Sequence, residues 1–599
     1  MCGIAGLVGA PDEALLDRLG AALHHRGPDG GGVVLDAEAG VGMVARRLAI
    51  LDLAGGDQPM ASADGAARIV FNGEIFNAPE LRAELEGEGV RFRSDHSDTE
   101  VVLALYERYG PDCLERLNGF FAFVVHDAAR ERLFGAVDRF GIKPLYLAEP
   151  RGALAWASEL KALLLVPGVE RDLDPSSLFH YLSLRFVPSP GSILAGVRRL
   201  EPGTAFQYDL ARRELAIERW WRLRFHPADE SHWHERLRAQ LRVSVRRWTL
   251  SDVPYAVSLS GGLDSSAIVG LLAESGVPDL RTYSVGFGED DELPIARALA
   301  ERYGTDHHEL TISADDLLDD LLAMVWALDE PYGGGLPSWY VFRFMAGDVK
   351  VGLTGSGGDE LFGNYRRFAP FERGRLARFR RRPVRRYHFE PSYYLSDGEK
   401  RELLLEPPPG DTADLLQRVY DDSGGGGPRD SVMALDIRTQ LADEFLLMTD
   451  RFAMAHSLEA RTPFLDHELV ELVASIPPAL RTDAGDPKGL LRESVADLLT
   501  PAHLDAPKRG FVLPLARWLR EELRPLAERL LSDEHLRRQG LFHPGLDERF
   551  LRPHVDGRRD ESERLWPLLM FQLWHLLYVE EALEDAPAFS WRELQAASR

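Results

Sequence analysis

Residues 255–266 read Tyr-Ala-Val-Ser-Leu-Ser-Gly-Gly-Leu-Asp-Ser-Ser. The apolar run at 255–259 predicts a buried strand, and residues 265–274 have the spacing of a following helix. Glycines between a strand and a helix let backbone N–H groups approach phosphate oxygens, and the helix N-terminus favours bound anions. Asp264 adds an oxygen ligand for Mg²⁺. The stretch therefore predicts a cradle for a polyphosphate; a glycine-rich turn capped by serines is the alternative.

This cradle carries no lysine, and the chain contains no Gly-x4-Gly-Lys-Ser/Thr stretch. It therefore differs from the phosphate loop of common kinases and ATPases. A lysine-free cradle suits a reaction in which pyrophosphate leaves and AMP is transferred. The predicted ATP-binding set is Ser258, Ser260, Gly261, Gly262, Asp264, Ser265, Ser266, Val285, Thr354 and Gly355.

A second acidic loop, Gly-Ser-Gly-Gly-Asp-Glu at 355–360, follows a predicted strand at 349–354. Ligands of doubly wound sheets bind beyond the carboxyl ends of the strands. We therefore expect Asp264 and Asp359 at one edge of the sheet, where they would share Mg²⁺, and adenine near Val285. Stabilisation of a helix N-terminus is the alternative role for Asp359.

Three regions differ in their apolar pattern. Short apolar runs bounded by glycine, asparagine and aspartate predict strands; they lie at 32–35, 68–71, 120–126, 132–134, 144–147 and 154–156. With helical spacing at 80–88 and 100–109 between them, they predict an α+β domain of stacked antiparallel sheets. From residue 255 to 354, strands alternate with helices, which predicts a parallel, doubly wound α/β sheet. From about residue 430 onward the pattern is almost entirely helical.

The composition is that of a globular protein with an acidic surface. The chain has 599 residues and a net charge of −25, which argues against a broad nucleic-acid surface. Its two cysteines, Cys2 and Cys113, exclude a disulfide framework and fit a reducing cytosol. The longest uncharged apolar run, 566–579, is too short to cross a bilayer and predicts a buried helix. No targeting segment is evident, so we expect a cytoplasmic protein with no membrane partner. The arginine-rich segment 366–386 favours a solvated face or loop over an anionic partner.

Cys2 follows Met1 directly. If Met1 is removed, one residue carries both a thiol and a free α-amino group, whose reference pKa is about 7.7–8.0. That amino group would accept the thiol proton, as in N-terminal-threonine nucleophiles. The alternative is a cysteine of no special role in a frayed terminus.

Together these features resemble the glutamine-dependent asparagine synthetase family, over most of the chain from Cys2 to about Trp574. The matching motifs are Met-Cys-Gly-Ile at 1–4, His-Arg-Gly-Pro-Asp at 25–29, Arg-Leu-Ala-Ile-Leu at 47–51, Phe-Asn-Gly-Glu-Ile at 71–75, Ser-Asp-Thr-Glu at 97–100, Asp-Arg-Phe-Gly-Ile-Lys-Pro-Leu-Tyr at 138–146, the cradle, Glu-Ala-Arg-Thr-Pro-Phe-Leu-Asp at 459–466 and Lys-Arg-Gly-Phe at 508–511.

The resemblance implies an N-terminal-nucleophile glutaminase domain at 2–205, a linker at 206–235 and a helix-rich N-type ATP pyrophosphatase domain at 236–599. In the first domain Cys2 would attack the glutamine amide to form a γ-glutamyl thioester. Asn72 and Gly73 would form the oxyanion hole. The implied glutamine-binding set is Arg47, Leu48, Ala49, Ile50, Leu51, Asn72, Gly73, Glu74 and Asp98. Arg47 would bind the α-carboxylate of glutamine, and Asp98 would bind its α-ammonium group. Considered outside these motifs, both residues are typical of surface charges.

In the second domain, the resemblance implies that a carboxylate is activated by ATP and Mg²⁺ as an acyl-adenylate. Ammonia from the glutaminase would arrive through an internal tunnel and displace AMP. Lys488 matches a family lysine near the phosphates; a solvated helix lysine is the alternative. The resemblance implies aspartate as the acceptor and asparagine as the product. Dimers are common in this family, so the resemblance also suggests a homodimer.

Two departures concern the acceptor. Ser356 stands where the family often has an acidic residue that helps the adenylate step, and three glycines at 333–335 occupy a candidate wall of the acceptor pocket. They leave open the same chemistry on another carboxylate, such as a sugar acid or a natural-product precursor, and a non-catalytic nucleotide-binding relative. A ring-closing relative of the β-lactam synthetases would not need Cys2, Asn72, Gly73 and Asp98 together.

Overall fold

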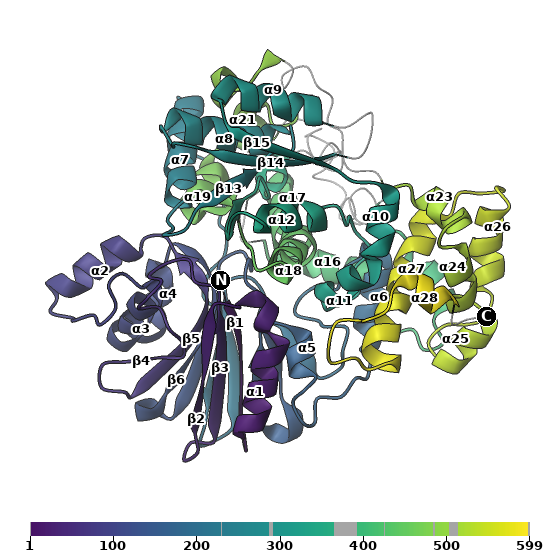
Figure 1. The fold of residues 1–599 in the computed structure, drawn as a ribbon, viewed down its shortest axis with the longest axis horizontal. Helices are drawn as coiled ribbons and strands as arrows, with labels where there is room; N and C mark the ends of the chain where they lie inside the picture. Colours follow the sequence, from purple (N-terminus) through teal and green to yellow (C-terminus); the bar gives the residue numbers. More distant parts are fainter. Residues whose placement is uncertain are drawn as a thin grey trace.

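The computed structural model describes residues 2–228, 230–286, 292–363, 392–423, 426–482, 485–501 and 513–596. Two antiparallel sheets lie against each other in the purple and blue part of Figure 1. In order across the first sheet, the strands are β10 (Val197–Arg199), β8 (Tyr146–Ala148), β9 (Ala155–Ala157), β1 (Cys2–Val8), β3 (Val41–Arg47) and β2 (Gly30–Asp36). The second sheet runs β12 (Glu214–Arg219), β11 (Thr204–Asp209), β7 (Arg132–Val137), β6 (Gly119–Asp127), β5 (Ala67–Ile75) and β4 (Met60–Ala61).

Burial on both faces explains the apolar strands of these layers. Every residue of β1 is buried, because β5 packs on one face and α1 (Glu13–Ala22) covers the other. On the second sheet, α3 (Asp98–Tyr109) packs against β5, and α2 (Ala78–Gly87) packs on α3. Strands buried on both faces read as continuous apolar runs rather than as alternating ones. The predicted stacked antiparallel sheets between helices are confirmed.

The antiparallel layers extend further than the sequence suggested. β11 and β12 pair with each other, and β11 pairs with β7. The second sheet therefore continues to Arg219, into the segment expected to be a linker at 206–235.

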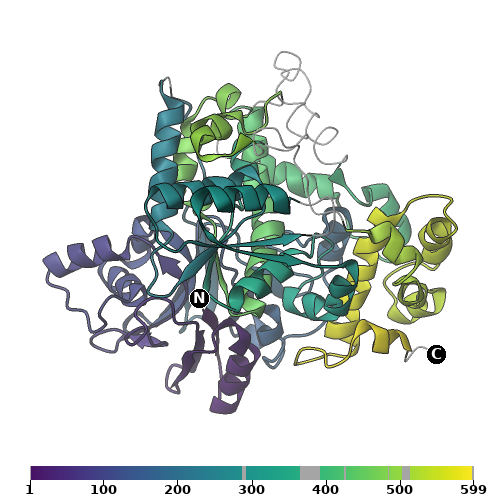
Figure 2. The ribbon, with the colours of Figure 1, turned by 45° about the horizontal axis from the view of Figure 1, so that its top comes forward.

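A third sheet is parallel throughout, with the order β15 (Asp306–Thr311), β14 (Arg281–Gly286), β13 (Tyr255–Ser258), β16 (Val351–Leu353) and β17 (Glu459–Arg461). It lies above the two antiparallel sheets in Figure 1, and Figure 2 shows helices on both of its sides. The helices that follow β13 and β14 are α8 (Leu263–Glu274) and α9 (Leu293–Tyr303). The predicted doubly wound sheet is confirmed. β17 lies in the stretch expected to be almost entirely helical; it has only three residues, too few for periodicity to reveal.

Aromatic side chains join the two parts of the chain into one core. The ring of Trp248, which follows α7 (Trp233–Arg247), lies 4.6 Å from the Phe76 ring and 5.5 Å from the Phe120 ring, measured between centroids. Such pairs stabilise beyond the apolar area that they bury. The two domains therefore share an apolar interface.

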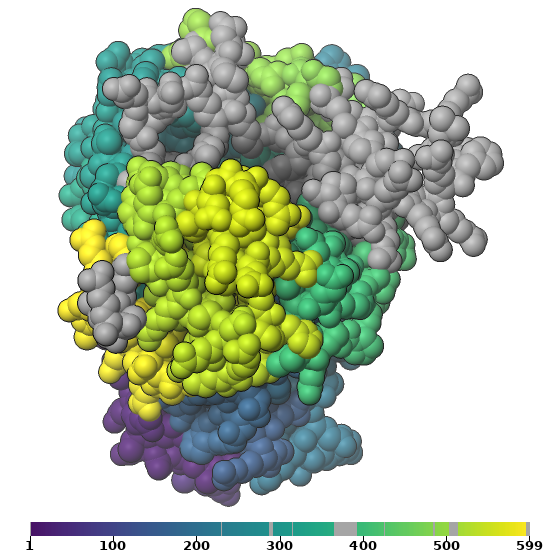
Figure 3. All heavy atoms as spheres, turned by 90° about the vertical axis from the view of Figure 1, so that its right-hand side faces the viewer, coloured from purple at the N-terminus to yellow at the C-terminus, as the bar shows by residue number. Residues whose placement is uncertain are grey.

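The C-terminal helices form the yellow-green face of Figure 3, above the blue and purple part of the chain. Among them, α27 (Ser562–His575) is buried along almost its whole length, so the predicted buried helix at 566–579 is confirmed over most of its range. Within the described residues, no helix is long and apolar enough to cross a membrane.

Gly6 provides a test of the packing between β1 and its neighbours. A Cβ at Gly6 would lie 2.3 Å from the Trp156 ring and 2.5 Å from the Gly42 carbonyl oxygen. We therefore expect Gly6→Ala to lower the stability of the N-terminal domain by about 1–3 kcal/mol, measured as a lower midpoint of thermal unfolding. Gly30→Ala is the control, because a Cβ there meets nothing within 4 Å. Equal midpoints for both variants would contradict this packing.

Candidate active sites

Cys2 begins β1 in the interior of the N-terminal domain. Its backbone N–H donates to Asn72 Oδ1 at 3.0 Å, and its carbonyl oxygen accepts from Arg26 Nε at 3.2 Å. Gln58 Nε2 lies 3.7 Å from the Cys2 sulfur, within reach of a weak N–H···S bond. Burial raises the pKa of the Cys2 thiol. A base must therefore remove the thiol proton before the sulfur can act as a nucleophile.

Asn72, on β5, supplies a free hydrogen-bond donor next to Cys2. The side chain is fully buried, and its Nδ2 has no hydrogen-bond partner among the described residues. A buried, unpaired donor is costly unless a ligand completes it. At the next position, a Cβ on Gly73 would lie 2.3 Å from the Phe120 carbonyl oxygen, so only glycine fits. The predicted pair thus lies together beside the thiol, with one donor ready for a ligand oxygen.

Arg47 lies directly opposite Cys2 in the register of β1 and β3. Its guanidinium donates to the carbonyl oxygens of Leu51 at 3.1 Å, Asp52 at 2.6 Å and Leu53 at 3.2 Å. It therefore shapes the segment after β3, the same segment that holds the expected glutamine-binding residues Leu48, Ala49, Ile50 and Leu51. The sequence predicted that Arg47 binds glutamine, but it did not predict that Arg47 also binds the carbonyl oxygens of this segment.

Asp98 and Glu74 form an acidic wall near the thiol. Asp98 Oδ2 accepts the Ile75 N–H at 3.0 Å, and burial raises the pKa of Asp98 to about 6. Burial, with Asp98 and Glu459 nearby, holds the pKa of Glu74 well above its usual range. Arg461 Nη2, from the other domain, lies 3.5 Å from Glu74 Oε2. This wall suits a ligand that brings an ammonium group.

A cavity of about 310 Å³ lies at the carboxyl edge of the parallel sheet. The predicted residues that line it are Ser258, Ser260, Gly262, Asp264, Ser265, Thr354, Gly355, Ser356 and Asp359. Three members of the predicted set lie outside its lining: Gly261, Ser266 and Val285. The structure thus brings both predicted loops to one cavity of a size suited to a nucleotide.

Other lining residues were not predicted: Ser338, Val341, Phe342, Gly357, Glu360, Phe445, Met448 and Thr449. Most of them come from α12 (Ser338–Ala346) and from the helical stretch of η9 (Ile437–Leu446) and α18 (Leu447–Ala455). Gly357 and Glu360 stand in the second acidic loop, but the residues from the helices have a local sequence typical of ordinary buried helix, so no local signal distinguishes them. The one regional signal is a π-helical geometry in η9, which is frequent at functional sites but is visible only in the structure.

Lys488 joins the two acidic loops. Its Nζ lies 2.5 Å from Asp359 Oδ1 and also pairs with Asp264 Oδ2. These carboxylates hold the pKa of Lys488 above its usual value although the side chain is buried. Two carboxylates converging on one point provide the oxygen ligands that Mg²⁺ prefers, so Asp264 and Asp359 fit the predicted metal role.

The two sequence features that depart from the family pattern, Ser356 and the glycines at 333–335, lie in different parts of the structure. Ser356 lines the cavity, and its Oγ accepts from Thr354 Oγ1 at 3.2 Å. None of the glycines at 333–335 lines the cavity; a Cβ at Gly333 would instead lie 3.2 Å from Arg185 Cβ. The arginine-rich segment 366–386 and the motif at 508–511 lie outside the described residues.

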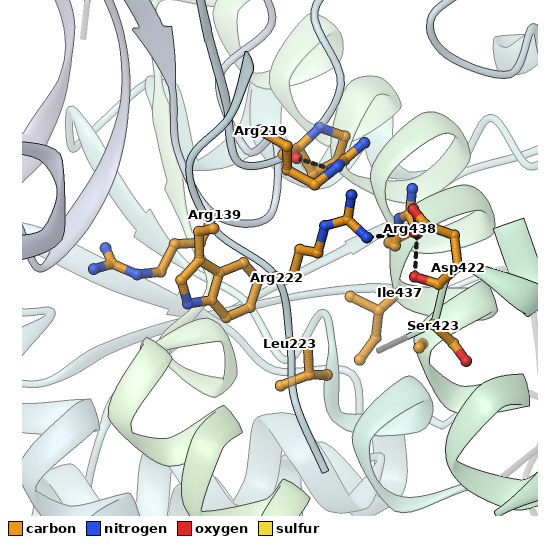
Figure 4. Close-up of a pocket in the computed structure, with 11 residues that line it drawn as sticks. Arg139, Arg219, Arg222, Leu223, Asp422, Ser423, Ile437 and Arg438 are labelled. Atoms are coloured by element: carbon orange, nitrogen blue, oxygen red, sulfur yellow. Dashed lines mark hydrogen bonds and ion pairs between the residues drawn. The ribbon is translucent and has the colours of Figure 1, made fainter. Parts of the chain in front are cut away.

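A second, much smaller pocket of about 20 Å³ holds room for little more than one water. Arg438 pairs with Asp422 at 3.1 Å and Arg222 pairs with the same carboxylate (Figure 4). Arg219 pairs with Glu201, outside the pocket, at 2.8 Å. We assign it to the packing between the domains.

Two family models match the chain. The asparagine synthase model covers residues 236–576, and the glutamine amidotransferase domain model covers residues 1–221. The chain belongs to the asparagine synthase family. Its relatives in this family include asparagine synthetase [glutamine-hydrolyzing] 1 of Bacillus subtilis (strain 168), 31% identical over 97% of this chain and 97% of the relative. Asparagine synthetase [glutamine-hydrolyzing] 3 of the same organism is 33% identical over 83% of this chain and 85% of the relative.

Membership of the family confirms the resemblance found in the sequence and the expected order of the two domain types. A solved structure described as the allosteric regulatory enzyme of purine biosynthesis is also similar, at 18% identity over 51% of this chain and 65% of that chain. Its TM-score of 0.29 is too low to add to these conclusions.

Lys488→Met tests the charge balance of the cavity. The substitution leaves Asp264 and Asp359 facing each other without their cation, which disfavours an incoming polyphosphate. Since removal of one partner of a buried charge pair costs about 2–5 kcal/mol, we expect MgATP to bind at least about 30-fold more weakly. Isothermal titration calorimetry measures the change. The control is Lys350→Met, which removes an exposed partner of Asp29 and is expected to leave the affinity unchanged. Unchanged binding by Lys488→Met would contradict the role assigned to this lysine.

Proposed function

We propose that this chain is a glutamine-hydrolysing, ATP-dependent amidotransferase that converts a carboxylate to an amide through an acyl-adenylate, with aspartate as acceptor and asparagine as product. AMP, pyrophosphate and glutamate are the other products. The observation that carries the proposal is the cavity in which a lysine-free glycine–serine turn, with Asp264, lies beside Asp359, while Lys488 pairs with both carboxylates. Family membership and the relatives' names support it.

In the proposed glutaminase step, Cys2 Sγ attacks the side-chain amide carbon of glutamine. Removal of Met1 would turn the Cys2 nitrogen, now bonded to Asn72 Oδ1, into an α-amine able to take the thiol proton. Asn72 Nδ2 and the Gly73 N–H stabilise the tetrahedral oxyanion, each donor contributing about 2.7–4 kcal/mol. The proton passes to the leaving nitrogen, ammonia departs, and water then hydrolyses the thioester to glutamate.

In the proposed synthetase step, the acceptor carboxylate attacks the α-phosphorus of ATP, and pyrophosphate leaves. Backbone N–H groups of the turn and Lys488 meet the phosphate charge. Asp264 and Asp359 would hold Mg²⁺, which supplies neutralisation of the polyphosphate. Ammonia then attacks the acyl carbon, and AMP leaves.

Neutral ammonia must reach the second site without meeting bulk water, where it is protonated. The aromatic contacts of Trp248 with Phe76 and Phe120 seal part of the interface between the domains. We propose that ammonia moves through this buried region. Two free, buried cysteines support our expectation of a reducing, cytoplasmic setting.

A second acceptor class is favoured by one wall of the cavity. Val341, Phe342, Phe445 and Met448 give this wall an apolar character, and Ser356 stands where the family often has an acidic side chain. Such a wall suits a carboxylate that carries an apolar group better than it suits aspartate. By contrast, the unpaired Asn72 donor argues against a non-catalytic relative, since a silent glutaminase would have no use for it.

Cys2→Ala separates the two reactions. We expect this variant to lose glutamine-dependent product formation and to keep ammonia-dependent synthesis at the rate of the unmodified enzyme. The assay measures AMP and pyrophosphate with L-aspartate and with a panel of other carboxylic acids. AMP formation with other acids only would replace aspartate as the acceptor. ADP and orthophosphate as products, or glutamine use by Cys2→Ala, would contradict the proposal.

The pH dependence of glutamine use tests Asp98. Because its pKa is raised to about 6, the side chain becomes protonated as the pH falls below that value and can no longer attract the glutamine ammonium. We expect kcat/KM for glutamine to fall about tenfold per pH unit below pH 6. Asp98→Asn should give a low value that does not change over this range. Ammonia-dependent synthesis by the same samples controls for acid effects on the other site. An unchanged acid limb in Asp98→Asn would assign the titration to another group.

A further inference from the structure

α18 (Leu447–Ala455) lies between the two candidate sites and is buried along nearly its whole length. Met448 and Thr449, in its first turn, line the nucleotide cavity. The next two residues, Asp450 and Arg451, contact the glutaminase domain instead. Adjacent residues of an α-helix point in directions about 100° apart, so one turn reaches both sites.

Asp450 binds the Arg26 side chain, and Arg26 in turn binds the main chain of Cys2. Arg26 Nη1 donates to Asp450 Oδ2 at 2.9 Å, and Arg26 Nη2 donates to Asp450 Oδ1 at 3.0 Å. The same guanidinium donates through Nε to the Cys2 carbonyl oxygen at 3.2 Å. Both side chains are at most 1% exposed. Glu159 of the same domain also accepts from Arg26 Nη1, at 2.7 Å. The bidentate pair with Asp450 adds a second constraint, so the position of the Cys2 main chain depends in part on a carboxylate of the other domain.

Two further contacts tie this helix region to the same strand. Arg451 Nη2 donates to the Ser158 carbonyl oxygen at 3.0 Å, and Ser158 Oγ accepts the Ile4 N–H at 3.1 Å. Just beyond the helix, Ser457 Oγ donates to the His25 carbonyl oxygen at 2.7 Å. A shift of α18 would therefore move β1 and the segment before Arg26 together, because closely packed interiors transmit displacement rather than absorb it.

We propose that Asp450 is a positioning residue for Cys2, acting through Arg26, and that α18 thereby transmits occupancy of the nucleotide cavity to the glutaminase site. The proposal rests on the proposed function. A ligand that presses on Met448 or Thr449 changes the placement of Asp450, and with it the alignment of the thiol and the Asn72 donor. Coupling between two binding sites typically changes an affinity by about 5–150-fold.

The test is Asp450→Asn in the full chain, with glutaminase turnover measured with and without MgATP and L-aspartate. In the unmodified enzyme we expect these ligands to change glutaminase kcat about fivefold or more. In Asp450→Asn we expect that response to disappear and the basal kcat to fall about tenfold, with KM for glutamine nearly unchanged. Ammonia-dependent synthesis should stay near its normal rate, and Asp450→Glu should restore part of the response.

Asp443→Asn is the matched control. Asp443 is also a buried carboxylate that pairs with an arginine of the other domain, Arg199 Nη2 at 2.9 Å, yet Arg199 has no bond to Cys2. It should keep the ligand response. If Asp450→Asn fails to fold, the double variant Arg26→Gln with Asp450→Asn, which leaves neither partner of the pair charged, replaces it and should lack the response.

The outcomes separate the two proposals. No glutaminase activity in the unmodified chain would sink the proposed function. An active enzyme in which Asp450→Asn behaves like Asp443→Asn, or in which glutamine-dependent and ammonia-dependent rates fall equally, would overturn the positioning role alone.

Discussion

Charged side chains buried between the two domains constrain the rest of the structure. Arg26 and Lys143 of the first domain share Asp450 of the second, while Arg451 reaches back to Glu159. A buried charge without a partner destabilises the fold by several kcal/mol, so removing one member of a buried ion pair is strongly destabilising. Since the partners come from different domains, the charges are satisfied together in one relative placement. That placement fixes the distance and orientation between the thiol and the nucleotide cavity.

Burial disfavours charged side chains at both sites, but only at the second site do neighbouring charges outweigh it. In the glutaminase it raises the pKa values of the Cys2 thiol and of Asp98, so the thiol needs a base to reach its charged form, while Asp98 loses its charge as the pH falls below about 6. In the cavity, Asp264 and Asp359 keep Lys488 charged despite its burial. The first site is thus prepared for proton transfer, and the second for binding a dense negative charge.

Much of this organisation was predictable. Residues 255–266 predicted strand, turn and helix, and the structure has β13, the turn and α8 in that order. The pattern did not indicate strands that are short or paired with distant strands: β17 has three residues, and β11 and β12 belong to a sheet whose other members precede residue 138. Periodicity is a local signal, so it reports neither the partner of a strand nor an element shorter than one repeat.

The sequence by itself determined which side chains we propose for the chemistry. Cys2, Asn72, the glycine–serine turn, Asp264, Asp359 and Lys488 all stand in motifs whose residue types suit the proposed steps. Tertiary structure alone decided what surrounds them. The apolar wall from α12 and α18, the loop-shaping bonds of Arg47 and the link from Asp450 through Arg26 to Cys2 join residues far apart in the chain. Such contacts form only when helices and sheets pack, because burial and pairing of charges are properties of the folded interior and not of any local pattern.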